Sequence, residues 1–135
     1  MIKDLKYLMA YSIAIIAFIG ILAGGPLVYL TVVYTFIFIP ILESNTKEYK
    51  NEYSDDEKKN RNLDPFFDFL LYLNIPIVFG IFFVSLNTLL YTNSVYEIIG
   101  IIISASIVMA TNGINVAHEL GHRVNQFEQT LAKLL

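Results

Sequence analysis

Two histidines lie four residues apart near the end of the chain, in the stretch AHELGHR at residues 117–123. They are the only histidines in the sequence. In an α-helix each residue advances about 100°, so His118 and His122 would lie about 40° apart on one face. Imidazoles placed in this way can ligate one metal ion together, or supply one ligand each to a pair of ions. The spacing therefore predicts a metal site with His118 and His122 as ligands.

Glu119 lies between the two histidines and completes the pattern HExxH. In zinc metalloproteases this pattern places two histidines on the zinc ion and the glutamate as general base for a bound water. On a helix, Glu119 would be about 100° away from His118. It could reach a bound water, cap the end of the helix, or bond a residue next to the ligands. The motif leaves these roles of Glu119 open.

The composition is that of a membrane protein. Hydrophobic residues make up 56% of the chain and charged residues 16%, whereas about a quarter of the residues of a globular protein are charged. No charged residue occurs in residues 7–42 or 69–96, and such runs are longer than a buried core helix needs. A net charge of −3 without a basic stripe argues against nucleic acid as a partner. The absence of cysteine excludes disulfides, iron–sulfur clusters and thiolate ligands within the chain.

The apolar residues divide into four expected membrane-spanning helices, at 7–23, 26–42, 65–92 and 96–122. Glycines 24 and 25 followed by Pro26 should separate the first two, because paired glycines loosen a helix and proline begins the next one. Pro40 is expected to kink or end the second helix, and Pro76 to bend the third. Residues 43–64 carry seven acidic and five basic side chains and predict a solvated loop. A capping box favours a short surface helix at 54–61 within this loop.

These elements predict one membrane domain over residues 1–135, of the all-α class, with four transmembrane helices arranged as two hairpins. The N-terminus, the loop at 43–64 and the histidine motif then share one side of the membrane, and all nine lysines and arginines lie on that side. By the positive-inside rule this side is cytoplasmic. We expect a multi-pass protein of the cell's inner (plasma) membrane. Small residues in the fourth helix favour close helix packing, namely Gly100, Ser104, Ala105, Ser106, Ala110 and Gly113.

The stretch NVAHELGHR at residues 115–123 resembles the first histidine box of the integral-membrane alkane monooxygenases, which reads N-x-A-H-E-L-G-H-K. These alkane hydroxylases belong with the fatty acid desaturases and hydroxylases. Arg123 stands where lysine is commoner and keeps the charge. The two hairpins around a charged loop also look like that family, and residues 71–76 are similar to the proline-containing start of its third helix.

The resemblance implies a non-haem diiron enzyme that inserts one atom of O₂ into the terminal methyl group of an alkane or a related apolar chain. A redox metal suits this reaction, because an alkane C–H bond offers no handle for acid–base chemistry. His118 and His122 would be iron ligands, electrons would come from a rubredoxin-type donor, and the apolar substrate would arrive through the lipid of the membrane. The family has two further histidine clusters, which residues 1–135 lack. We therefore expect the N-terminal part of a longer enzyme, inactive alone, with the other iron ligands outside this segment.

Two other interpretations stay open. The first is a membrane zinc metalloprotease of HExxH type, with His118 and His122 as zinc ligands and Glu119 as general base. Such an enzyme needs one more zinc ligand. Alternatively, the helices form a membrane scaffold in which the histidines are incidental. Helical spacing places Thr111, Ile114 and Asn115 on the histidine face. Asn115 is expected to donate to an imidazole or to Glu119, and Thr111 to its own backbone, while Ile107 and Ile114 either line a substrate passage or only pack.

Overall fold

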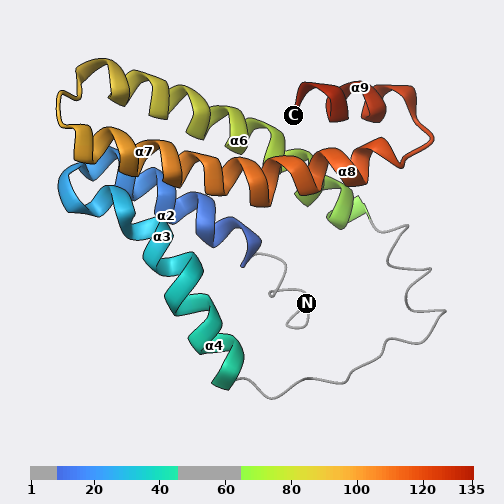
Figure 1. Cartoon of the computed structure of the whole chain (residues 1–135). Coiled ribbons are helices and arrows are strands. Elements are labelled where there is room, and N and C mark those ends of the chain that lie inside the picture. Colours follow the sequence, from blue (N-terminus) through green and yellow to red (C-terminus); the bar gives the residue numbers. More distant parts are fainter. Residues whose placement is uncertain (1–8, 46–64) are drawn as a thin grey trace.

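The computed structural model describes residues 9–45 and 65–135, which form helices and no strand (Figure 1). The all-α class is thus confirmed for this part of the chain. Residues 46–64, including most of the expected loop and its surface helix, lie outside it. One apolar helix, α2, is shorter than a typical span, with 14 residues at Ala10–Ala23. Three longer stretches are apolar enough to cross a membrane, Gly25–Asn45, Phe66–Tyr91 and Val95–Gly121.

The first helix ends where the paired glycines were expected to break it. Gly24 and Gly25 have positive φ angles, of 69° and 56°. A residue with a Cβ atom is destabilised in this conformation, whereas glycine adopts it at almost no cost in free energy. Pro26 follows in a short 3₁₀ helix, η2 (Gly25–Tyr29). A Cβ atom at Gly20 would lie 2.5 Å from the Leu27 carbonyl oxygen. The chain therefore turns back directly against α2.

The second stretch continues through α3 (Leu30–Val33), a π-helical turn η3 (Tyr34–Phe38) and α4 (Ile39–Asn45). Pro40 was expected to kink or end this helix, and it does not end it, because α4 runs on to Asn45. A proline ring clashes with the carbonyl four residues earlier, and the wider π-turn just before Pro40 gives the ring room. None of residues 34–45 is buried, and Figure 1 shows α4 leaving the other helices.

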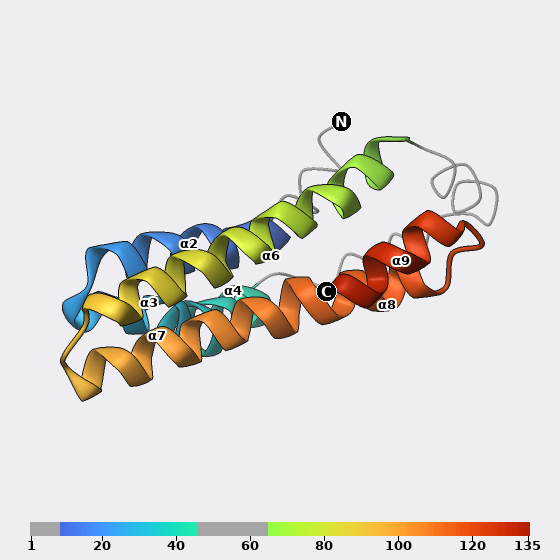
Figure 2. The same ribbon diagram turned by 90° about the horizontal axis from the view of Figure 1, so that it is seen from above.

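The second pair of helices is longer. Helix α6 (Pro65–Tyr91) begins at Pro65 and passes through Pro76 without interruption. The return segment consists of α7 (Val95–Val108), a π-helical turn η4 (Met109–Ile114) and α8 (Asn115–Gly121). Figure 2 shows that these three elements form one continuous rod beside α6. We call this segment the α7–α8 rod (Val95–Gly121).

A further helix, α9 (Gln126–Leu134), was not expected from the sequence. It folds back beside α8 (Figures 1 and 2). Its first turn is capped by Asn125, whose side-chain oxygen accepts a hydrogen bond of 3.0 Å from the Phe127 N–H. Helix α9 is short, and its apolar residues alternate with polar ones. It therefore lacks the long apolar run by which the membrane-spanning helices were predicted from the sequence.

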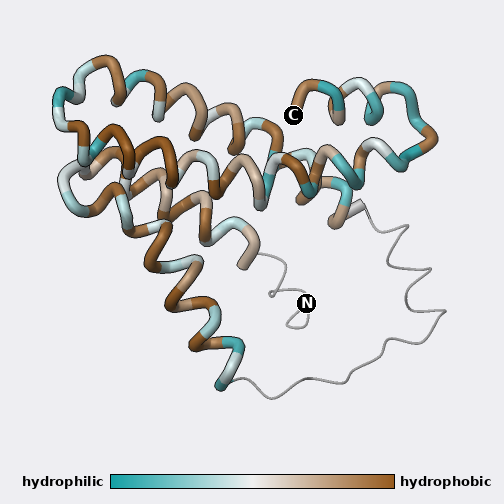
Figure 3. Tube along the Cα trace, in the orientation of Figure 1, coloured by the Kyte–Doolittle hydropathy of each residue, from teal (hydrophilic) through white to brown (hydrophobic). Residues whose placement is uncertain are grey.

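Small residues bring the α7–α8 rod close to the first hairpin. The Ser104 hydroxyl donates a hydrogen bond of 2.5 Å to the Val28 carbonyl, and a Cβ atom at Gly100 would collide with the side chains of Val28 and Tyr29. Such contacts are typical of packed membrane helices, although Ser106 and Ala110 of the predicted set face outward. Many large apolar side chains of these helices are exposed, as expected of helices that meet lipid, and Figure 3 shows how apolar residues predominate along α2, α6 and α7.

Candidate metal site at the end of α8

The two imidazoles lie side by side at the end of the α7–α8 rod. Their Nε2 atoms are 3.3 Å apart, and their ring centroids are 4.5 Å apart with nearly perpendicular planes. Both side chains are exposed. Two nitrogens that bind one ion at about 2.1 Å are separated by about 3.0–3.4 Å, depending on the angle at the ion. The spacing of His118 and His122 thus fits two ligands of a single metal ion.

The pair is not a complete metal site by itself. Within residues 9–45 and 65–135, no group of three or more histidine, cysteine, aspartate or glutamate side chains could hold an ion. Zinc and iron both accept imidazole nitrogens and both require more than two ligands. The geometry of His118 and His122 therefore fits either metal, and other ligands would have to complete the site.

Glu119 and Asn115 have surroundings that the helical spacing did not predict. The Glu119 carboxylate is exposed, and its Oε1 atom lies 4.0 Å from Nε of Arg123. The expectation that Asn115 donates to an imidazole or to Glu119 is wrong. Its Nδ2 atom donates to the Thr111 carbonyl at 2.9 Å. Thr111 itself donates to the Ile107 carbonyl at 2.8 Å, as expected of a threonine that bonds its own helix backbone.

A charged cluster fixes the chain just after the histidines. Nη1 of Arg123 lies 2.7 Å from Oδ1 of Asp68 on α6 and 3.5 Å from Oε1 of Glu128 on α9. Glu128 is buried and also accepts a hydrogen bond of 2.5 Å from the Tyr72 hydroxyl. Burial alone would lower the pKa of the Arg123 guanidinium, but the hydrogen bond to Asp68 and the neighbouring carboxylates raise it above its ordinary value. Arg123 is therefore a fixed cation that joins α6, α8 and α9.

A buried polar network lies between the helices at η4, the turn of the α7–α8 rod that precedes the histidines. Nδ2 of Asn112, within η4, donates to Oδ1 of Asn74 at 2.9 Å and to the Ala10 carbonyl at 3.2 Å. Asn74 donates to the Tyr11 hydroxyl at 3.3 Å, and this hydroxyl donates to the Leu70 carbonyl at 2.5 Å. The network joins α2, α6 and η4. The signal that could have revealed it is the presence of two asparagines within apolar spans, where polar side chains need protein partners.

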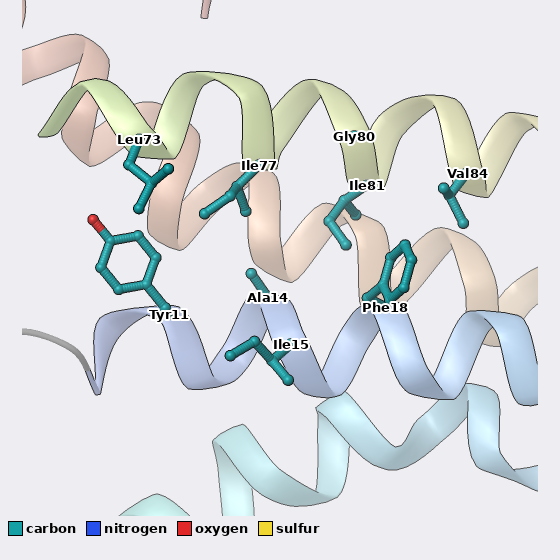
Figure 4. A pocket seen from close by; sticks show the side chains of 9 residues that line it. All are labelled: Tyr11, Ala14, Ile15, Phe18, Leu73, Ile77, Gly80, Ile81 and Val84. Atoms are coloured by element: carbon teal, nitrogen blue, oxygen red, sulfur yellow. The ribbon is translucent and has the colours of Figure 1, made fainter. Parts of the chain in front are cut away.

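An apolar cavity of about 660 Å³, open on one side, lies between α2 and α6. Figure 4 shows the side chains that line it, which are Tyr11, Ala14, Ile15, Phe18, Leu73, Ile77, Gly80, Ile81 and Val84. Tyr11 belongs both to the cavity and to the polar network, so the cavity borders that network at one end. Ile107 and Ile114, considered above as lining residues, are not part of the wall, and Ile114 is exposed.

Comparison of the chain with protein-family models, with curated proteins and with solved structures found no match. A function must therefore be argued from the residues and their geometry.

Proposed function

We propose that this chain is the membrane-embedded, N-terminal part of a non-haem diiron monooxygenase that hydroxylates the terminal methyl group of alkanes or related apolar chains. The observation that carries the proposal is the close pair of imidazoles at the exposed end of an apolar helix, within a stretch that resembles the alkane monooxygenase histidine box. In this proposal α2 also spans the membrane, so that four helices form two hairpins in the inner (plasma) membrane. The N-terminus and the histidines are then cytoplasmic, where a rubredoxin-type donor can reach the site.

His118 and His122 would each donate a ring nitrogen to iron, and the remaining ligands come from residues outside this segment. The iron, when bound, supplies the activation of O₂ that attack on an unactivated C–H bond requires. Arg123 holds the end of α8 against Asp68 and Glu128, which keeps the imidazoles in place relative to α6. The apolar cavity between α2 and α6 has a volume in the range of small-molecule sites, and its lining suits a hydrocarbon chain that enters from lipid.

A membrane zinc metalloprotease is the second candidate. The exposed carboxylate of Glu119 favours it, because this side chain follows His118 directly and has the position of the general base in an HExxH site. Such an enzyme needs one zinc ion and one further ligand rather than two histidine clusters.

The metal content of the full-length protein separates the two functions. The monooxygenase predicts two iron ions per chain, which are lost when His118 or His122 is replaced by alanine. One zinc ion per chain would instead identify the protease. Glu119→Gln provides the matched comparison, because it keeps both imidazoles. It should leave the metal in place in either enzyme, abolish a peptidase, and leave an oxygenase with measurable turnover of an alkane or fatty acyl substrate.

A further inference from the structure

The two histidines of the pair are anchored differently by their own helix. His118 lies within α8, whereas His122 follows its last residue, Gly121, as the C-cap. The His122 N–H donates to the Glu119 carbonyl at 3.3 Å, and the next N–H along the chain donates to the Leu120 carbonyl at 3.2 Å. Both bonds reach only three residues back, as in a 3₁₀ turn, whose hydrogen-bond geometry is poorer than that of an α-turn. The helix itself therefore holds His122 less firmly than His118.

Helix α9 contacts the chain on both sides of His122. Before it, a Cβ atom built at Gly121 would lie 4.0 Å from the Cβ atom of Ala132, so α9 passes within van der Waals reach of the backbone there. After it, the Arg123 carbonyl lies between the two helices, and the Gln129 side chain donates to it from Nε2 at 2.9 Å. His122 thus lies between two backbone positions that α9 contacts.

The bond from Gln129 acts on the backbone, unlike the ion pairs of Arg123. Those ion pairs hold the guanidinium at the end of a long side chain. The Arg123 carbonyl belongs to the backbone one residue after His122, so few dihedral angles separate it from the Cα atom that carries the imidazole. Gln129 is itself held, because its N–H donates to the Asn125 carbonyl at 3.1 Å and the Asn125 side chain caps α9. The donor therefore has a fixed place beside the turn.

A side chain that satisfies a carbonyl group beyond a helix end commonly serves stability alone. Here the turn also carries a candidate ligand, and two nitrogens on one ion tolerate only a narrow range of separation. We propose that Gln129 is a positioning residue. Its bond to the Arg123 carbonyl holds the end of α8 in the conformation in which His122 reaches the same ion as His118. This inference rests on the proposed function in one respect, that the pair binds a metal ion, and it applies to iron and to zinc alike.

The test measures chelation by the pair, with Cu²⁺ complexed by iminodiacetate as the probe. Cu²⁺ prefers tetragonal sites with nitrogen and oxygen ligands, and this complex leaves positions for two imidazoles. A nitroxide is attached at Phe83→Cys, an exposed position on α6, in the metal-free, full-length protein. Residues 1–135 contain no other cysteine, and any cysteine elsewhere is replaced. The copper–nitroxide distance from pulsed electron resonance identifies ions at this pair, and its amplitude during a titration gives their affinity.

Gln129→Ala and Gln129→Glu should each weaken this binding about tenfold, the lower end of the losses seen when a group that orients a metal ligand is removed. Gln129→Glu keeps the size of the side chain and loses its N–H donors, and it serves if the alanine variant does not fold. Gln126→Ala and Gln126→Glu change an exposed residue of the same helix in the same ways. These matched controls should bind copper as the wild type does.

A second background separates positioning from general destabilisation. In the His118→Ala chain, His122 binds copper alone, so its place relative to a partner no longer matters. Gln129→Ala should then have no further effect, at the higher copper concentrations that one imidazole needs.

The proposal is wrong if the Gln129 variants chelate copper as tightly as the wild type, or if the Gln126 controls weaken binding equally. It is also wrong if Gln129→Ala weakens binding by His122 alone. A wild-type pair that binds no copper at this distance would contradict the metal site of the proposed function as well. Native affinity in both Gln129 variants would contradict this inference and leave the proposed function intact.

Discussion

Arg123 and Asp68 form an ion pair in which Nη1 and Oδ1 are 2.7 Å apart. The pair joins the residue that follows the histidines to the first turn of α6, although the two residues are far apart in the sequence. The same guanidinium reaches Glu128 of α9 at 3.5 Å. One side chain therefore connects three helices at the end of the molecule that carries the candidate metal site.

We expect the two members of this pair to differ in their contribution to stability. Arg123→Ala should lower the free energy of unfolding by about 2–3 kcal/mol, because it leaves the buried Glu128 without a cation. Asp68→Ala should cost less than about 1 kcal/mol, because Asp68 is about one-third exposed and Arg123 keeps Glu128. Unfolding in detergent micelles measures both values. Equal losses of unfolding free energy in the two variants would show that the buried Glu128 carboxylate does not need the Arg123 guanidinium as its cation.

Gly100 and Gly80 form a matched pair for testing how closely the helices approach. Gly100→Ala should destabilise the fold by about 1–3 kcal/mol, because its Cβ atom would meet Val28 and Tyr29. Gly80→Ala has no atom within 4 Å of the new Cβ atom and should be neutral or stabilising by up to about 1 kcal/mol, as helix propensity predicts. The thermal midpoints of the two variants provide the measurement. A neutral Gly100→Ala variant would mean that α7 does not lie against η2 as described.

The 3.3 Å separation of the imidazole nitrogens predicts chelation of a single ion by both residues. Replacing either His118 or His122 by alanine should therefore remove nearly all binding of Cu²⁺ or Ni²⁺, rather than half of it. Equilibrium dialysis of the wild type and both single variants decides the matter. Binding reduced to half in each variant would show that the histidines act independently.

Labelling with a membrane-impermeant maleimide tests the orientation. A single cysteine at Asn93, between α6 and α7, should react in intact cells, whereas one at Gln126 in α9 should react only after the membrane is opened. Both positions are exposed. Residues 1–135 contain no native cysteine that would also react with the maleimide. Reaction of the Gln126 site in intact cells would place the histidines outside and exclude access by a cytoplasmic electron donor.

Local sequence signals predicted the features that depend on neighbouring residues. The break after α2 follows from the backbone freedom of Gly24 and Gly25, and the start of α6 from a proline at the first helical position. The closeness of His118 and His122 follows from helical geometry alone. These features need no knowledge of what packs against them.

Other features depend on contacts between distant segments and could not be predicted in this way. The expected role of Asn115 failed because its side-chain amide donates to the Thr111 carbonyl, one turn earlier in the same segment, and residue spacing does not decide between that backbone acceptor and a side chain on the same face. The bonds of Asn112 depend on Asn74 and on the Ala10 carbonyl, which lie on other helices. The Arg123 cluster needs α9, a short helix without a strong hydropathy signal. The helix does not end at Pro40, where a π-turn directly precedes the ring and gives it room.

The length of the α7–α8 rod has a consequence for anything dissolved in the bilayer. The distance from Val95 to His118 along the helix axis is about 35 Å, more than the ~30 Å thickness of the hydrocarbon layer. In the proposed topology, with Val95 at the opposite edge of that layer, the ring nitrogens would lie at the level of the lipid headgroups, among water. A hydrocarbon tail drawn to that height would lose about 0.8 kcal/mol for each methylene it exposes. The proposed enzyme would therefore need a dry conduit walled by protein above the lipid, through which a long apolar molecule would advance with one end leading.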